Sequence, residues 1–158
     1  MKKKSQSGIT LIEILVTLII LSIGFLGLAS VQLLGTRNVS NSSFRSLATI
    51  YAYDMVERMR ANQVGVESGD YQGVSTLNAV DPGCSPCGTA ERAQLDLFEW
   101  GSLLEENALN GGLPNGSGAI DFDGGNREYT ITITWSENVR EDNGPETVNQ
   151  NYSLVVRL

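Results

Sequence analysis

Two cysteines separated by two residues, Cys84 and Cys87, have the spacing of thiol–disulfide redox pairs. Redox chemistry of this kind needs a cysteine at the N-terminus of a helix in a βαβ unit, where the helix lowers the pKa of the thiol. A helix is predicted just after Cys87, but no parallel sheet is predicted before it. A structural disulfide is therefore favoured over a redox site, with two free thiols as the third alternative. The loop is so short that the bond adds less than the roughly 3 kcal/mol expected for a 15-residue loop.

Other constellations offer little chemistry. The chain contains no histidine, and two cysteines do not complete a zinc site. Asp121 and Asp123 beside Gly124 suggest calcium, but this ion takes six to eight oxygens, so a plain acidic hairpin is favoured. Four aromatic residues recur at helix or strand spacing, which is more typical of core than of a ligand face: Phe98, Trp100, Tyr129 and Trp135. We expect no cofactor, no metal and no small-molecule substrate.

Glu13 stands at the edge of a long uncharged segment. Residues 14–36 carry no charge, and as a helix these 23 residues would be about 34 Å long, enough to cross a bilayer core of about 30 Å. A carboxylate carried to mid-bilayer costs on the order of 2.5–3.5 kcal/mol, so it usually has a partner or a function. From spacing alone the segment also fits a secretory signal peptide cut before Ser30, or a plain membrane anchor.

Charge is distributed unevenly along the chain. The 158 residues have a net charge of -7, and the lysines are Lys2, Lys3 and Lys4. A basic leader favours a cytoplasmic N-terminus, with the bulk of the chain across the membrane. Because that bulk is more acidic than the whole, a nucleic-acid partner is not expected for this chain by itself.

One long helix is predicted from residue 9 to about residue 60, since no proline interrupts this range. Its second half is amphipathic, with an apolar stripe at helical spacing: Phe44, Leu47, Ala48, Tyr51, Met55 and Met59. Gly24 and Gly27 interrupt the apolar half, either for close helix packing or as a point where the helix stretches.

The remaining residues predict a small α+β domain over 61–158. Residues 62–88 are expected to form an irregular connector with a short extended piece at 73–80, and residues 90–109 a second helix. Strands are expected at 119–123, 128–136 and 152–158, with a polar loop at 137–146. The result is an antiparallel sheet of about three strands whose apolar face packs on the stripe of the long helix.

The first residues carry a family resemblance. Gly8 followed by Ile9-Thr10-Leu11-Ile12-Glu13 resembles the signal of type IV prepilins and pseudopilins, although the family most often has Phe where Ile9 stands. The resemblance implies that a prepilin peptidase removes leader 1–8 by cutting between Gly8 and Ile9, and that the new amine of Ile9 is methylated. It also implies that Glu13 pairs with the N-terminus of a neighbouring subunit, and that the fold is pilin-like: a long membrane helix over 9–60 packed on the small sheet.

The second half is similar to one group within this family. The two cysteines, the segment 93–100, Leu113-Pro114 and Trp135 resemble the PilV group of minor pilins, the type IV pilus modification proteins. This resemblance implies a non-enzymatic structural subunit that primes or caps a type IV pilus. Its expected partners are prepilin peptidase, other minor pilins, the major pilin and the inner membrane, with a periplasmic C-terminal domain. Two alternatives are a minor pseudopilin of a type II secretion system and a signal-anchored periplasmic thiol oxidoreductase.

Overall fold

The computed structural model describes residues 10–105, 111–141 and 144–158, and the chain divides into two compact units at Ser40 and Asn41. Helix α1 (Leu11–Ala61) begins in the first unit and ends in the second. It confirms the long helix predicted from the sequence and runs through Gly24 and Gly27 without interruption. By length and composition it can cross a membrane, with an 18-residue stretch of mean hydropathy 2.6.

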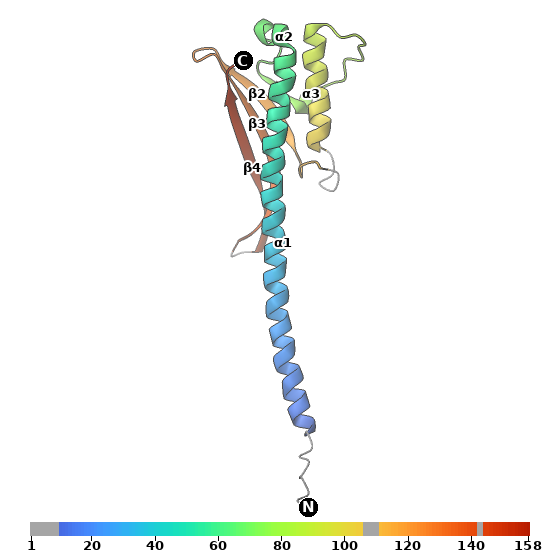
Figure 1. The fold of residues 1–158 in the computed structure, drawn as a ribbon, viewed down its shortest axis with the longest axis vertical. Coiled ribbons are helices and arrows are strands. Elements are labelled where there is room, and N and C mark those ends of the chain that lie inside the picture. The colour runs from blue at the N-terminus through green and yellow to red at the C-terminus, as the bar shows by residue number, and fades with distance from the viewer. Residues whose placement is uncertain (1–9, 106–110, 142–143) are drawn as a thin grey trace, which may run out of the picture. The chain divides into compact units, whose positions relative to one another are not determined.

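The second unit contains the remaining elements. They are α2 (Gln63–Ser68), β1 (Val74–Ser75), the short 3-10 helix η1 (Thr76–Asn78), α3 (Thr89–Glu105), β2 (Ser117–Asp123), β3 (Glu128–Glu141) and β4 (Gly144–Val156). The strands form one sheet in the order β1-β2-β3-β4, and every pair is antiparallel; β2, β3 and β4 are labelled in Figure 1. The α+β, pilin-like architecture expected from the sequence is thus confirmed.

The core lies between α1 and the inner face of the sheet. Ala48, Met55 and Met59 of the predicted stripe on α1 are fully buried, and its other members pack against the core while partly exposed. Ala52, which was not in the predicted stripe, is also fully buried. They share one cluster with buried residues of the sheet and of α3: Trp100, Leu104, Ile120, Tyr129, Ile131, Ile133 and Trp135. Alternate positions of β3 face this cluster because side chains of a strand point to opposite faces in turn.

Local contacts explain where α3 begins and how closely it approaches the sheet. The Gly88 N–H donates to Glu91 Oε2 at 2.9 Å, so an acidic side chain in the first turn caps the helix start. Farther along α3, the Trp100 ring lies directly over Gly118 of β2, in space that a Cβ at Gly118 would occupy. The predicted helix over 90–109 is confirmed as far as Glu105, and its last residues lie outside the described ranges.

The small antiparallel sheet of about three strands has a fourth, the two-residue β1, but the polar loop expected at 137–146 was wrong. β3 continues through Glu141 and pairs with β4 without a break, from Tyr129 opposite Val156 to Glu141 opposite Gly144. Residues 137–146 are mostly polar, so their sequence did not predict this part of the hairpin. Trp135 Nε1 donates to Glu137 Oε1 at 2.9 Å, so this buried carboxylate is accommodated inside the strand rather than in a loop.

The connector is also more ordered than expected. Asn62 caps α2, since its Oδ1 accepts a hydrogen bond from the Gly65 N–H at 3.3 Å. Gly69, at φ 85°, ends α2 in the left-handed conformation that glycine adopts without strain. β1 lies inside the extended piece expected at 73–80.

Candidate functional site

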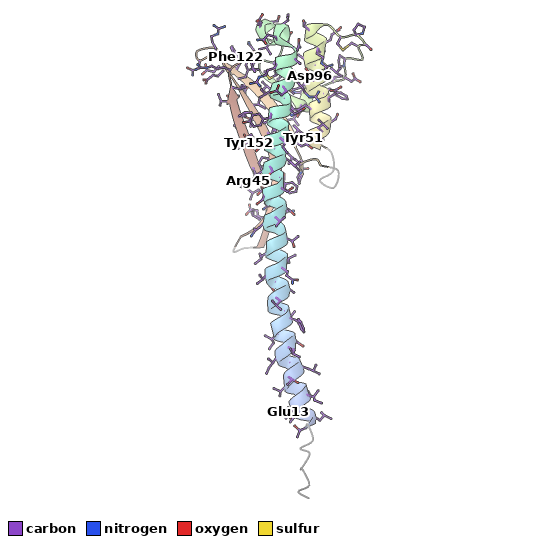
Figure 2. All side chains as sticks on the ribbon, viewed as in Figure 1. Glu13, Arg45, Tyr51, Asp96, Phe122 and Tyr152 are labelled. Carbon is purple, nitrogen blue, oxygen red and sulfur yellow. A yellow bond between two sulfur atoms is a disulfide. The ribbon has the colours of Figure 1, made fainter. Side chains whose placement is uncertain are left out.

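Glu13 lies in the first turn of α1, close to the beginning of the helix (Figure 2). Its backbone N–H donates to the Thr10 carbonyl at 3.0 Å, and a carboxylate in this turn is favoured by the free N–H groups of the helix N-terminus. Within the described part of the chain, Glu13 has no ion-pair partner. Gly8 and Ile9, the two residues of the predicted cleavage and methylation site, lie outside the described residues.

The first unit exposes apolar side chains on every side of α1 (Figure 2). Leu11 is 80% exposed and Phe25 is 66% exposed. Each square ångström of apolar surface costs about 25 cal/mol in water, so this segment requires lipid or other apolar helices around it. Its length, composition and exposure together indicate membrane anchoring.

Hydroxyl groups within this segment are already hydrogen-bonded. Thr17 Oγ1 donates to the Ile14 carbonyl at 2.8 Å, and Ser22 Oγ donates to the Leu18 carbonyl at 2.7 Å. Ser30 repeats the pattern on the carbonyl of Leu26. These internal bonds remove the penalty of placing a free donor in hydrocarbon, so the segment is compatible with a bilayer.

The two cysteines form a disulfide, with Cα atoms 5.0 Å apart. Cys87 lies two residues before α3, the position that suggested redox chemistry. A depression of about 300 Å³ beside it is lined by Ala61, Asn62, Cys87, Gly88, Thr89 and Arg92. None of these lining residues is a general base, and every strand pair of the described sheet is antiparallel, unlike the parallel sheet of thioredoxin-like sites.

A buried polar cluster lies where α1, α2 and α3 come together. Tyr71 Oη donates to Asp96 Oδ2 at 2.7 Å and accepts from Asn62 Nδ2 at 3.1 Å. Asp96 is fully buried, and its Oδ1 lies 3.0 Å from Arg92 Nε and 3.6 Å from Arg58 Nη1. Sequence reasoning missed this cluster because its members are far apart in the chain and no motif links them.

The cluster has consistent electrostatics. Burial, aided by the hydrogen bond to Asp96, raises the pKa of the Tyr71 hydroxyl, so Tyr71 is a neutral donor. Partial burial lowers the pKa of Arg58, but hydrogen bonds to Glu99 and Asp54 outweigh it and the pKa is raised overall. These groups hold each other in fixed charge states, which is what a structural junction requires.

The acidic hairpin uses its own carboxylate. Asp123 Oδ1 accepts from the Gly125 N–H at 2.8 Å, and Oδ2 accepts from Asn126 Nδ2 at 2.8 Å. The bond from Gly125 is the main cause of a lowered pKa at Asp123. Across residues 10–105, 111–141 and 144–158, no group of three His, Cys, Asp or Glu side chains is arranged to hold a metal ion.

The aromatic residues considered as a ligand face lie mostly in the core. Trp100, Tyr129 and Trp135 are at most 3% exposed, and Trp100 Nε1 donates to the Tyr51 carbonyl at 3.0 Å. Phe98 is half-buried at a shallow groove between α1 and α3. They form packing contacts rather than a binding surface.

Comparison with known proteins gives one match. Residues 3–29 match the family model described as the prokaryotic N-terminal methylation motif. No curated protein and no solved structure matches the chain. The matched segment includes Gly8, Ile9 and Glu13 and is type IV prepilin-like, which implies processing by prepilin peptidase. Proteins with this motif are generally structural, and its presence here supports a type IV pilin or pseudopilin family protein.

Proposed function

We propose that this chain is a minor type IV pilin, a structural subunit that primes or caps pilus assembly. The observation that carries the proposal is the methylation motif over residues 3–29, placed directly on the apolar start of α1. The resemblance of the C-terminal half to the PilV group supports a minor rather than a major subunit.

Processing and topology follow from the leader. Prepilin peptidase cuts between Gly8 and Ile9, removes the three lysines and leaves Ile9 as a methylated N-terminus. Before the cut, the lysines hold the N-terminus in the cytoplasm and the second unit lies in the periplasm. The disulfide between Cys84 and Cys87 fits that oxidising compartment.

Glu13 acts in docking between subunits. Cleavage creates a cationic amine at Ile9, four residues before the Glu13 carboxylate, and both charges then lie at or in lipid. An isolated charge in that environment is costly, whereas a pair formed between neighbouring subunits lowers the penalty for both. Glu13 is available for such a pair because it is exposed at the helix start.

A non-enzymatic role fits the second unit. The chain has no histidine, and the depressions among the described residues are shallow and lack a nucleophile–base pair. The polar cluster around Asp96 is tied up internally and joins helices rather than facing a ligand.

The same motif also serves minor pseudopilins of type II secretion systems, which form the second candidate. The two candidates share the cleavage, the methylation and the role of Glu13. They differ in the process that fails when the chain is deleted.

Mass spectrometry of the membrane-extracted chain tests the processing step. We expect loss of residues 1–8 and the addition of one methyl group at Ile9. A mature chain that starts at Ser30, or an intact leader in cells with active peptidase, would contradict the proposal.

A matched pair of variants tests the docking step. Glu13→Ala should remain cleaved and membrane-bound but enter surface filaments poorly, whereas Glu67→Ala, at an exposed carboxylate on α2, should behave like the parent chain. Equal recovery of both variants in sheared filaments would show that the Glu13 carboxylate is not needed. Deletion that spares pili but blocks enzyme secretion would favour the pseudopilin.

A further inference from the structure

Strand β4 is one edge of the sheet, and it is long and regular. It runs from Gly144 to Val156 and pairs with β3 at every position, without a bulge. In the described sheet no strand pairs with its other side (Figure 1). The backbone groups that face outward along β4 are therefore available to another chain.

The sheet register identifies which groups these are. The Ser136 N–H donates to the Pro114 carbonyl at 2.8 Å, on the side of β3 that faces away from β4. Successive residues of a strand direct their backbone N–H and C=O groups to opposite sides. The backbone groups of Trp135 are therefore directed toward β4, where Trp135 is opposite Gln150. Even-numbered residues of β4 thus bond to β3, and the outward positions are Pro145, which has no N–H, and then Thr147, Asn149, Asn151, Ser153 and Val155.

A second contact gives the same result independently. The Gly118 N–H donates to Thr76 Oγ1 at 2.9 Å, so the backbone N–H and C=O of Gly118 are directed away from β3. Its partner in β3 is Ile133, whose backbone N–H and C=O are consequently directed to β4 and to its partner there, Tyr152. The assignment of the outward residues in β4 is therefore consistent across the sheet.

Pro145 and Glu146 protect only the start of this edge, and the rest of it lacks the protection that natural sheets usually give to an open strand. Residues 147–156 contain no charged residue and no proline, although charges, prolines, bulges and short length are the usual protections. The opposite edge is protected in two of these ways. β1 is only two residues long, and beyond it β2 carries the charged residues Asp121 and Asp123. The difference indicates that the β4 edge is kept open for pairing.

The side chains beside this edge are only partly covered. Ile131 and Ile133 of β3 are completely buried, whereas their partners Leu154 and Tyr152 in β4 remain half-buried. An added strand would cover these two apolar side chains with its own inward-facing residues.

We propose that the open edge of β4 is the docking site for a β-strand supplied by a different protein chain. The outward N–H and C=O groups from Thr147 to Val155 can all be hydrogen-bonded by the extended backbone of one added strand. Half-buried Tyr152 and Leu154 require apolar side chains at alternate positions of that strand. The inference rests on the proposed role in assembly and specifies how the second unit takes part.

Charge decides against a second copy as the partner. Before Asn41 the only acidic residue is Glu13, and the basic ones are three leader lysines and Arg37, so residues 41–158 hold 17 acidic residues against seven arginines. A second copy would bring the same excess of negative charge and be repelled, whereas a basic domain would be attracted.

The test removes one outward N–H group. Asn151→Pro deletes the central outward donor and leaves the bonds to β3 in place, whereas the matched control Asn151→Thr keeps the donor and changes the side chain. Each full-length chain carries a photo-crosslinking residue in place of Ser153 and is expressed in the cells that naturally produce it. We expect one heterologous adduct with Asn151→Thr, its loss with Asn151→Pro, and a drop in filament recovery on the order of tenfold for the proline variant.

A second variant covers the case in which the proline disturbs the fold. An Asn-Gly turn and a nine-residue strand appended after Leu158 would occupy the edge from within the same chain, and a control extension carries prolines in that strand. The strand extension should lower filament recovery without lowering the melting temperature, and its control should not. Normal recovery of both edge-blocked chains, or an adduct of twice the chain mass, would overturn the inference. If the parent chain itself is absent from filaments, the proposed function is wrong. The inference is then tested by crosslinking alone, through the presence of the heterologous adduct with Asn151→Thr and its loss with Asn151→Pro.

Discussion

Removing the hydroxyl of Tyr71 should destabilise the second unit. In the Tyr71→Phe variant the buried Asp96 loses the hydrogen bond to its Oδ2, while its Oδ1 already lacks one within the described residues. Hydrogen bonds to charged groups contribute about 1.5–3 kcal/mol, and the ion pairs to Arg92 and Arg58 remain, so we expect a loss of about 2 kcal/mol. For a unit of this size that corresponds to a fall in melting temperature of roughly 6–10 °C.

The assay is urea unfolding of the full-length chain in detergent micelles, followed by tryptophan fluorescence. Trp100 and Trp135 are buried in the second unit, so both report its unfolding. Tyr53→Phe removes the same hydroxyl from a residue that is 53% exposed and should change the free energy of unfolding by less than about 0.5 kcal/mol. Equal midpoints for the two variants would refute the role assigned to the cluster.

The pH dependence gives a further check on Tyr71. Its pKa is raised above the ordinary value of 10.0, so the folded state keeps the proton at pH values where the unfolded state has lost it. The stability that Tyr71 contributes is therefore fully present below pH 10.0 and is lost as the pH rises above it. The difference between the parent chain and Tyr71→Phe should shrink in that range, and a constant difference would contradict the shift.

Three further changes have defined outcomes. Gly118→Ala should cost about 1–3 kcal/mol in the same assay, because its Cβ meets the Trp100 ring, while Gly124→Ala should be nearly neutral since its nearest neighbour is 3.8 Å away. Cys84→Ser should lower stability by less than roughly 3 kcal/mol and leave one thiol that alkylates without reductant; full alkylation of the parent chain would disprove the bond. Asp123→Asn should lower the melting temperature at neutral pH, and this difference should vanish as the pH falls well below 3.8, because the folded pKa of Asp123 is depressed; a loss that persists in acid would exclude the carboxylate as its cause.

Periodicity was sufficient to predict the long helix, its buried stripe and the alternating part of β3. These features depend on residues close in sequence, whose spacing directly reports which face is buried. The part of the hairpin formed by residues 137–141 of β3 and 144–148 of β4 was missed because its stability comes from pairing across the hairpin, and its residues are mostly polar. Likewise α2 depends on one cap, Asn62, whose role requires knowing that Gly65 is its partner.

Glu13 and the leader, which are proposed to act in docking and processing, were assigned from a local motif that the family model over residues 3–29 also matches. The cluster of Asn62, Tyr71 and Asp96 could not be predicted, because polar residues at separate points of the chain give no signal until the fold brings them together. The open edge of β4 was hidden for a related reason. Whether a strand lies at an edge depends on the order of the sheet, which pattern alone does not specify.

The shared core has a consequence for biogenesis. Ala48 and Met55 emerge from the ribosome early, yet the β2 and β3 residues of the same buried cluster are synthesised much later. Tyr129 Oη donates to the Val66 carbonyl across 63 residues of chain, so the contacts that complete the unit have high sequence separation. During synthesis the amphipathic half of α1 therefore remains exposed until the final hairpin is made, and throughout that interval it depends on a chaperone or another apolar surface for cover.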